Sequence, residues 1–260
     1  MTTAAGQSGQ TIAGIERALD VLSLFSDSDQ ASLGVTEIAQ ELGLSKAVVH
    51  RILASFRAKG FVELDEATRR YSIGPKILFL GLTYLERIDI RQVARDAMVR
   101  LSAETNETAT LSIRSGRNRV YVDQITPPRD VKMQVSLGTP YPLHAGASSK
   151  AFLAFLPAHE QDDYLDHPLE RLTDSTEVDT RKLRKELLRI REVGYASSFG
   201  ERMDGAGAVA APVFGLDGTP VAVISVCGPV ERFREEADDA ARLLLEATRQ
   251  ASQRMGYRSA

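Results

Sequence analysis

The chain has 260 residues, of which 43% are hydrophobic and 26% are charged, a balance typical of a soluble globular protein of one or two domains. Its formal net charge is −3, no apolar run approaches the roughly 18 residues of a membrane span, and the N-terminus lacks the basic start and apolar core of a secretory signal. The single cysteine, Cys227, excludes an internal disulfide and a cysteine-rich zinc site, so a reducing cytoplasm is the expected compartment.

Residues 1–11 are polar and small and are expected to be disordered, and residues 12–74 are expected to form the first domain. This domain opens with a predicted helix whose apolar stripe is expected to cover the two helices that follow. The stripe consists of Ile15, Ala18, Leu19, Leu22 and Phe25.

The next two predicted helices have the spacing of a helix-turn-helix. Ala39 is small where the two helices must cross closely, and Gly43 follows four residues later, where a tight turn needs a residue that tolerates positive φ. Ser45 can cap the second helix of the motif and Gly60 can end it. Residues 61–73 then read as a short hairpin, so this run predicts a winged helix-turn-helix that sits on duplex DNA.

The positive charge of the chain is concentrated on this motif. Residues 44–76 hold seven basic and three acidic residues, and residues 44–60 hold no acid at all, although residues 1–43 hold six acids against one base. A basic patch of this size on a neutral to acidic body is expected to contact phosphates at a limited, site-selecting interface. A merely solvated basic face is the alternative interpretation.

The second helix of the motif is expected to bury one face and to turn the other toward DNA. Val49, Ile52, Leu53 and Phe56 form the predicted buried face. Arg51 is expected to contact either a guanine edge or only a phosphate, and the wing arginines are expected to reach the minor groove or its flanking phosphates. The residues expected to contact DNA are Thr36, Ser45, Lys46, Ala47, Val48, His50, Arg51, Arg57, Arg69 and Arg70.

Residues 75–90 are expected to form a linker helix, and residues 91–260 a second domain. The linker is unusually apolar, so burial of Ile77, Leu78 and Leu85 between two subunits is expected. The second domain alternates predicted helices, at 91–105, 148–155, 180–193 and 235–253, with predicted strands, at 108–113, 120–125, 131–137, 209–214 and 220–227. This order predicts an α+β sensor sheet.

Several sequence motifs run in order from about residue 12 to residue 234, at 15–22, 71–75, 141–151, 187–195, 209–214 and 224–229. Together with the helix-turn-helix they resemble the IclR family of bacterial transcription regulators. The resemblance implies a linker helix that dimerises, a C-terminal GAF-like domain that binds a small, often carboxylated or aromatic metabolite, and dimers or tetramers on palindromic operators. Ala47-Val48 stands where family members often have Ser-Thr, and its methyl groups suit thymine methyls.

An effector pocket is expected in the second domain. The N–H groups of Ala147 and Ser148 precede a predicted helix and favour an anion such as a carboxylate. The resemblance places the other ligand-facing positions at Ser198, Ala206, Ala208, Ser225 and Cys227. Members that respond to glyoxylate and pyruvate carry aspartate, cysteine and serine where this chain has Ser198, Ala208 and Cys227. We therefore expect a carboxylic acid that is larger or less polar than glyoxylate.

Other functions are expected to be absent. No nucleophile or acid–base pair can be assembled, Cys227 lies in an apolar strand typical of an inert thiol, and the histidines show no metal-ligand spacing, so neither catalysis, a metal nor a cofactor is expected. His144 is expected to be a hydrogen-bonded structural residue or a pocket wall. An enzyme with an appended DNA-binding module, and a winged helix that binds proteins, remain the alternatives.

Overall fold

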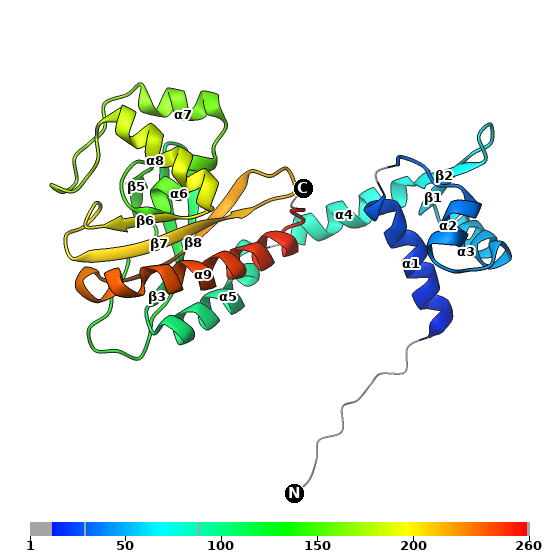
Figure 1. The fold of residues 1–260 in the computed structure, drawn as a ribbon, viewed down its shortest axis with the longest axis horizontal. Coiled ribbons are helices and arrows are strands. Elements are labelled where there is room, and N and C mark those ends of the chain that lie inside the picture. Colours follow the sequence, from blue (N-terminus) through cyan, green and yellow to red (C-terminus); the bar gives the residue numbers. More distant parts are fainter. Residues whose placement is uncertain (1–11, 29, 88, 259–260) are drawn as a thin grey trace, which may run out of the picture. The chain divides into compact units, whose positions relative to one another are not determined.

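The structure of the protein is a computed structural model that describes residues 12–28, 30–87 and 89–258 (Figure 1). The chain divides into two compact units, residues 1–87 and residues 88–260. No helix within the described residues is long and apolar enough to cross a membrane.

The N-terminal unit has the order helix, helix, helix, hairpin, helix (Figure 1). Its elements are α1 (Ala13–Asp27), α2 (Val35–Glu41), α3 (Lys46–Ala58), β1 (Val62–Asp65), β2 (Arg70–Ile73) and α4 (Pro75–Arg87). Gly43 makes the turn between α2 and α3 with φ of +61°, as the sequence predicts. The strands β1 and β2 pair antiparallel as the wing. The winged helix-turn-helix is therefore confirmed.

The predicted apolar stripe of α1 is only partly correct. Ile15 and Leu19 are 55% and 56% exposed, whereas Val21 and Phe25 are buried in the core of the unit. Only the second half of α1 packs against the core, so the N-terminal half presents its apolar side chains to solvent. A regular helical spacing identifies a face of a helix but not how far along the helix that face is covered.

The C-terminal unit is a six-stranded antiparallel sheet with the order β5-β4-β3-β8-β7-β6 and helices on both faces. The strands are β3 (Thr108–Ser115), β4 (Asn118–Ile125), β5 (Pro140–Pro142), β6 (Ala196–Phe199), β7 (Ala206–Phe214) and β8 (Pro220–Pro229). The helices are α5 (Ile90–Thr105), α6 (Ala147–Phe155), α7 (Ala158–Leu165), α8 (Thr180–Val193) and α9 (Val230–Arg254). The α+β fold class is confirmed.

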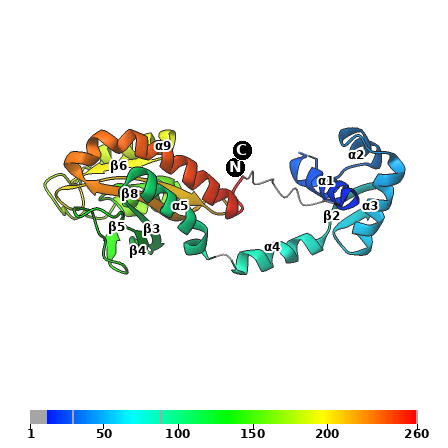
Figure 2. The same ribbon diagram turned by 90° about the horizontal axis from the view of Figure 1, so that it is seen from below.

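Two apolar cores lie on opposite faces of this sheet. Helices α5 and α9 lie side by side on one face, where they cover alternate residues of β7 and β8 such as Val209 and Ile224 (Figure 2). Helix α6 covers the other face, over Ala210 and Val223, and α8 packs against α6 in the same core. Because successive residues of a strand point to opposite faces, one strand pair serves both cores.

The predicted strand at 131–137 is wrong. These residues form an extended strap without a strand, and only Leu137 makes an isolated bridge, to Tyr121. Side chains of the sheet hold the strap instead: the Thr108 hydroxyl donates to the Met133 carbonyl at 2.6 Å, and the Gln124 amide bonds both backbone groups of Val135. Three short elements, β5, α7 and β6, were not predicted from the sequence.

Candidate nucleic-acid interface and ligand cavity

Helix α3 turns a polar face to solvent. The Ser45 hydroxyl caps the helix by accepting the Val48 N–H at 3.3 Å, while Val49 and Leu53 lie in the core. Lys46, Ala47, His50 and Arg51 are exposed and Val48 is half-buried, which agrees with the predicted orientation of the helix. The side chains that we expect to contact DNA are therefore accessible on this face.

The first turn of α2 and the wing border a concave surface of about 390 Å³ beside α3. Thr36, His50, Thr68 and Arg69 contribute to its lining. Arg69 has a positive φ of 58° and pairs with Glu66 at 2.7 Å, and Arg57 pairs with the same carboxylate at 3.0 Å. Such exposed ion pairs are weak, so a phosphate can replace the carboxylate as the partner of either arginine.

Arg70 is engaged within the domain, which differs from the DNA contact that the sequence analysis expects. Its guanidinium donates to both carboxylate oxygens of Glu37 at 2.9 and 2.8 Å, to the carbonyl and hydroxyl of Ser32, and to Gln30. Glu37 also accepts the N–H of Gly34, the residue before α2, at 2.9 Å. Arg70 thus fastens the wing to the start of α2 through these contacts.

A second site lies in the C-terminal unit, where a small cavity of about 30 Å³ lies at the N-terminus of α6. Six of the seven expected effector residues line it: Ala147, Ser148, Ser198, Ala206, Ala208 and Cys227. Ser225 does not, because its hydroxyl bonds that of Thr110 at 2.6 Å between β8 and β3. The cavity is also lined by residues that no sequence motif identified: Arg119, Tyr121, Met133 and Arg202.

Arg119 is the dominant group of this cavity. It is 1% exposed, and its guanidinium donates to the hydroxyls of Ser149 at 2.8 Å, Tyr121 at 3.0 Å and Ser112 at 3.3 Å. Burial lowers the pKa of this guanidinium, and the charge of Arg202 lowers it further. Because Ser149 belongs to the first turn of α6, the buried positive charge lies beside the amide groups of that helix end.

Arg202 brings a second positive charge to the same cavity. Its guanidinium carbon lies 4.9 Å from the ring centre of Tyr141 and 5.8 Å from that of Tyr121, while Arg119 lies 4.2 Å from the Tyr121 ring. At the start of α6, Gly146 has φ of +89°, and a Cβ there would lie 3.2 Å from the Cβ of Arg202. The glycine therefore allows Arg202 to pack against the helix end.

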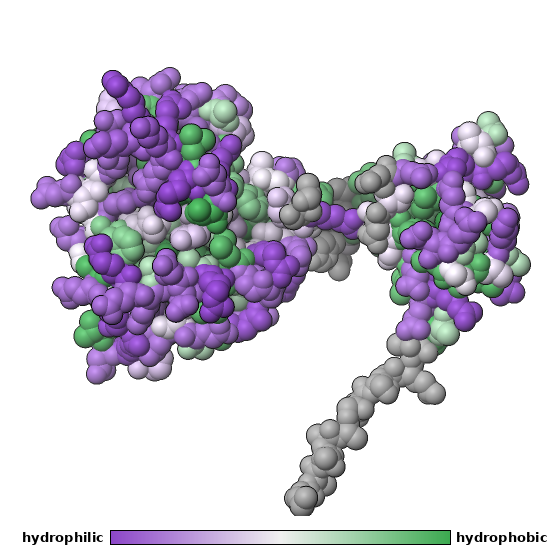
Figure 3. Space-filling model, viewed as in Figure 1, coloured by the Kyte–Doolittle hydropathy of each residue, from purple (hydrophilic) through white to green (hydrophobic). Residues whose placement is uncertain are grey.

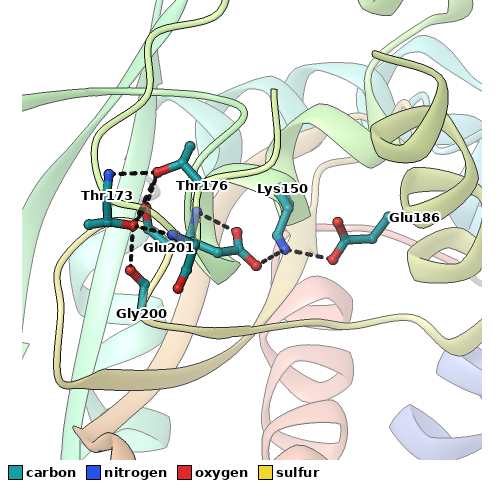
Figure 4. A network of polar contacts seen from close by, with 8 residues as sticks. Lys150, Thr173, Thr176, Glu186, Gly200 and Glu201 are labelled. Carbon is teal, nitrogen blue, oxygen red and sulfur yellow. Dashed lines mark hydrogen bonds and ion pairs between the residues drawn. The ribbon is translucent and has the colours of Figure 1, made fainter. Parts of the chain in front are cut away.

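A buried ionic network fixes this arrangement (Figure 4). The Lys150 ammonium donates to Glu201 at 2.5 Å and to Glu186 at 2.6 Å, and the other oxygen of Glu201 accepts the Gly146 N–H at 3.2 Å. The hydroxyls of Thr173 and Thr176 bond the Glu201 carbonyl. The residue next to Arg202 is thereby tied to α6 through its carboxylate and to the loop between α7 and α8 through its carbonyl.

Other reactive groups are occupied or inert. Burial raises the pKa of the Cys227 thiol to about 12, as expected of an unreactive cysteine. His144 bonds the Tyr164 hydroxyl through Nδ1 and the Glu170 carbonyl through Nε2, and burial lowers the pKa of its ring, so its predicted structural role is confirmed. Among the residues that the structure describes, no group of three or more histidine, cysteine or carboxylate side chains is arranged to hold a metal.

Comparisons with known proteins match both units. Residues 14–66 match the IclR helix-turn-helix domain, and residues 82–254 match the bacterial transcriptional regulator IclR C-terminal domain. The transcriptional regulator BhcR of Paracoccus denitrificans is 35% identical over 243 residues, which cover 93% of this chain and 86% of that protein. KipR of Bacillus subtilis is 31% identical over 245 residues, 94% of this chain and 97% of that one.

The crystal structure of HmgR from Pseudomonas aeruginosa superimposes with a TM-score of 0.84 at 30% identity, over 96% of this chain and all of that one. The order and spacing of both units thus agree with a helix-turn-helix domain joined to an effector-binding domain. The chain belongs to the IclR family of DNA-binding bacterial transcription regulators.

Proposed function

We propose that this regulator binds a palindromic operator as a dimer, or a dimer of dimers, through α3 and the β1–β2 wing, and that a small organic acid in the cavity at α6 changes its operator affinity. Its place of action is then the cytoplasm, on nucleoid DNA. The observation that carries the effector half of the proposal is the buried Arg119 beside the first turn of α6. A cation and free helix amides facing one cavity favour a carboxylate.

The chemistry of the cavity changes the kind of acid that we expect. The residues known from the sequence analysis, among them Ser198 and Ala208, are small and weakly polar, and by themselves they favour a less polar ligand. Arg119 and Arg202 add strong hydrogen-bond donors to the same walls. We therefore expect the negative charge of the ligand to be its main requirement. Because the free volume is small, we expect Arg202 or Met133, both partly exposed, to move when the acid binds.

We propose no catalytic role for the cavity at α6. The cavity offers arginines, hydroxyls and a thiol whose pKa is raised to about 12 by burial. The nearby carboxylates of Glu201 and Glu107 are engaged by Lys150 and by Arg232. Such a set can hold an anion, and the buried thiol is not an activated nucleophile.

The test uses Ser148→Pro, which removes one amide N–H from the first turn of α6 while proline remains acceptable near a helix start. Organic acids that raise the melting temperature of the wild type are identified first, and operator release by each is then measured by fluorescence anisotropy. We expect the variant to bind operator normally and to lose the response. Thr180→Pro, at the first residue of α8, is the matched control and should keep it.

An acid that stabilises the wild type and Ser148→Pro equally, and releases both from operator, would place the effector site elsewhere in the protein. Loss of operator binding by Thr180→Pro would show that proline at a helix start is itself disruptive. In that case Ser148→Gly separates loss of the N–H group from disruption of the helix start. Glycine keeps the N–H group, so this variant should respond to the acid normally.

A further inference from the structure

The cavity at α6 contains two positive charges and no carboxylate bound to either. Neither Arg119 nor Arg202 forms an ion pair with any residue in the described part of the chain. Other partly buried arginines of this unit do have acidic partners: Arg129 and Arg232 share the fully buried Glu107, and Arg114 pairs with Glu160. The arginines of the cavity are therefore exceptional within their own domain.

This arrangement is costly in the absence of a ligand. A buried guanidinium loses its hydration, and hydroxyl partners compensate less than a carboxylate does. The three hydroxyls that Arg119 contacts use three of the five N–H groups of its guanidinium, which leaves donors available. Arg202 adds repulsion between like charges, which is consistent with its lowering of the pKa of Arg119.

The neighbouring carboxylates Glu201 and Glu107 bind other groups. Glu201 precedes Arg202 in the chain, but its carboxylate is held by Lys150 and by the Gly146 N–H. Glu107 lies beneath Gly228, and one of its oxygens binds Arg129 and Arg232. The walls of the cavity therefore keep an excess of positive charge, to which the helix end of α6 adds its partial charge.

We propose that the ligand of this cavity is a dianion, a small organic acid with two carboxylates, one bound by Arg119 and the amides at the start of α6 and the other by Arg202. The proposal rests on the proposed function, because it assigns the charge of the effector at that same site. A monocarboxylate satisfies the helix end and Arg119, but it leaves Arg202 without a counter-charge. Two carboxylates neutralise both guanidinium groups.

The experiment compares acids that differ by one carboxylate, succinate with butyrate and phthalate with benzoate, by titration calorimetry on the full-length protein. We expect at least one dicarboxylate to bind roughly tenfold or more tightly than its monocarboxylate partner, since a close charge pair in a binding site contributes at least about that factor. Arg202→Gln should reduce this ratio to about one. Arg119→Gln should weaken both members of the pair.

Arg117→Gln is the matched control, because Arg117 lies on the same β3–β4 hairpin but pairs with Asp163 outside the cavity. It should keep the wild-type ratio. If Arg119→Gln does not fold, Arg202→Gln still decides the matter, since Arg202 is only half-buried. Three results would each overturn the dianion proposal. The first is equal binding of the two acids within both pairs, and the second is failure of both dicarboxylates to bind at millimolar concentration. The third is an unchanged affinity ratio in Arg202→Gln.

These outcomes are distinct from failure of the proposed function. A monocarboxylate that binds, and that Ser148→Pro or Arg119→Gln no longer binds, would leave the cavity as the effector site and remove only the second charge. An acid that releases operator from the wild type and from the Ser148, Arg119 and Arg202 variants alike would overturn both proposals. Tight binding of inorganic phosphate in place of either dicarboxylate would show a single anion position instead of two.

Discussion

Arg70 and Glu37 show how one contact decides the role of a charged residue. In the sequence, Arg70 is one of two bases on the wing, and its charge alone favours phosphate contact. In the fold, β2 places it opposite the start of α2, where Glu37 accepts from the Gly34 N–H and from two guanidinium nitrogens. We therefore infer that Arg70 positions the wing, and we expect the DNA contacts to come from exposed residues such as Arg51.

This pairing predicts a pH dependence. The hydrogen bond from Arg70, followed by that from the Gly34 N–H, holds the pKa of Glu37 below its ordinary value of 4.5. A carboxyl whose pKa is depressed on folding stabilises the fold above its unfolded pKa, and that stabilisation is lost as the pH falls through the folded pKa. The melting temperature of Glu37→Gln should thus lie below that of the wild type near pH 7, and the difference should shrink below about pH 4.5.

The control is Glu63→Gln, an exposed glutamate of β1, which should melt like the wild type throughout. Arg70→Ala should lower the melting temperature near pH 7 as Glu37→Gln does, and the double variant should be less destabilised than the sum of the two, because the residues share one interaction. Full additivity would contradict the pairing. If Arg70→Ala melts normally but binds all DNA sequences more weakly, Arg70 contacts a phosphate instead of positioning the wing.

Arg51 offers a test of base reading against phosphate contact. It is exposed on α3 in the described structure, one residue beyond His50. If it reads a guanine with two hydrogen bonds, Arg51→Ala should weaken operator binding by roughly 1–3 kcal/mol and relax the preference at one position, and Arg51→Lys should lose most of that preference. If it holds only a phosphate, Arg51→Lys should bind nearly normally. Anisotropy at fixed salt, with operator and a single-base variant, distinguishes the two, and normal binding by Arg51→Ala would exclude Arg51 from the interface.

At the scale of elements, the sequence was most informative where a local signal and the fold agree. Helix α8 begins after Asp179, whose carboxylate accepts the N–H groups of Arg181 and Lys182, and it ends at Gly194 with φ of 83°. Caps and a strong 3.6-residue period made its bounds predictable. The strap at 131–137 shows alternating apolar residues, but its backbone groups find side-chain partners instead of a neighbouring strand. Of the alternating residues Val135 is buried, whereas Val131 and Leu137 are 69% and 51% exposed, so the alternation predicted neither strand pairing nor one buried face.

The cavity was partly predictable for a related reason. Ala147 and Ser148 were identifiable because a helix start supplies amides whatever surrounds it. Arg119 and Arg202 were not, because an arginine in a strand or loop is expected at the surface unless its partners are known. Their partners, such as Ser149 and Tyr141, come from distant parts of the chain. Only the fold brings them together.

We expect helix α4 to form an interface between two subunits. Leu78 and Phe79 are each 60% exposed and Ile77 is half-buried, while the side chain of Leu85 lies outside the described residues. Ile15 and Leu19 of α1 are exposed as well. On the face seen in Figure 3, hydrophobic residues lie among hydrophilic ones over the N-terminal unit. Such surface on a helix favours burial against a second copy. Leu78→Glu should therefore produce monomers at micromolar concentration in sedimentation velocity.

Thr83→Glu, which introduces the same charge at an exposed polar position of α4, should leave the assembly intact. An unchanged oligomer in Leu78→Glu would show that α4 is not the interface. The variant should also lose operator affinity, because a monomer contacts one half-site only. In the intact dimer the two α3 helices are expected to read half-sites about one helical turn apart, ~10 bp from centre to centre, or a multiple of that distance.

Across the two units, the proposed function requires that binding of an acid in the cavity and binding of operator DNA at α3 are coupled, so that each changes the free energy of the other. If an acid changes the operator affinity by some factor, operator DNA must change the affinity for that acid by the same factor, typically about 5- to 150-fold in allosteric proteins. We expect equal factors from two measurements on the wild type: anisotropy of labelled operator with and without saturating acid, and calorimetry of the acid with and without saturating operator. Ser148→Pro should give no coupling in the first measurement because it no longer holds the acid. An acid that binds the cavity with the same affinity in the presence and absence of operator would show that the site is not linked to DNA binding, whatever its affinity.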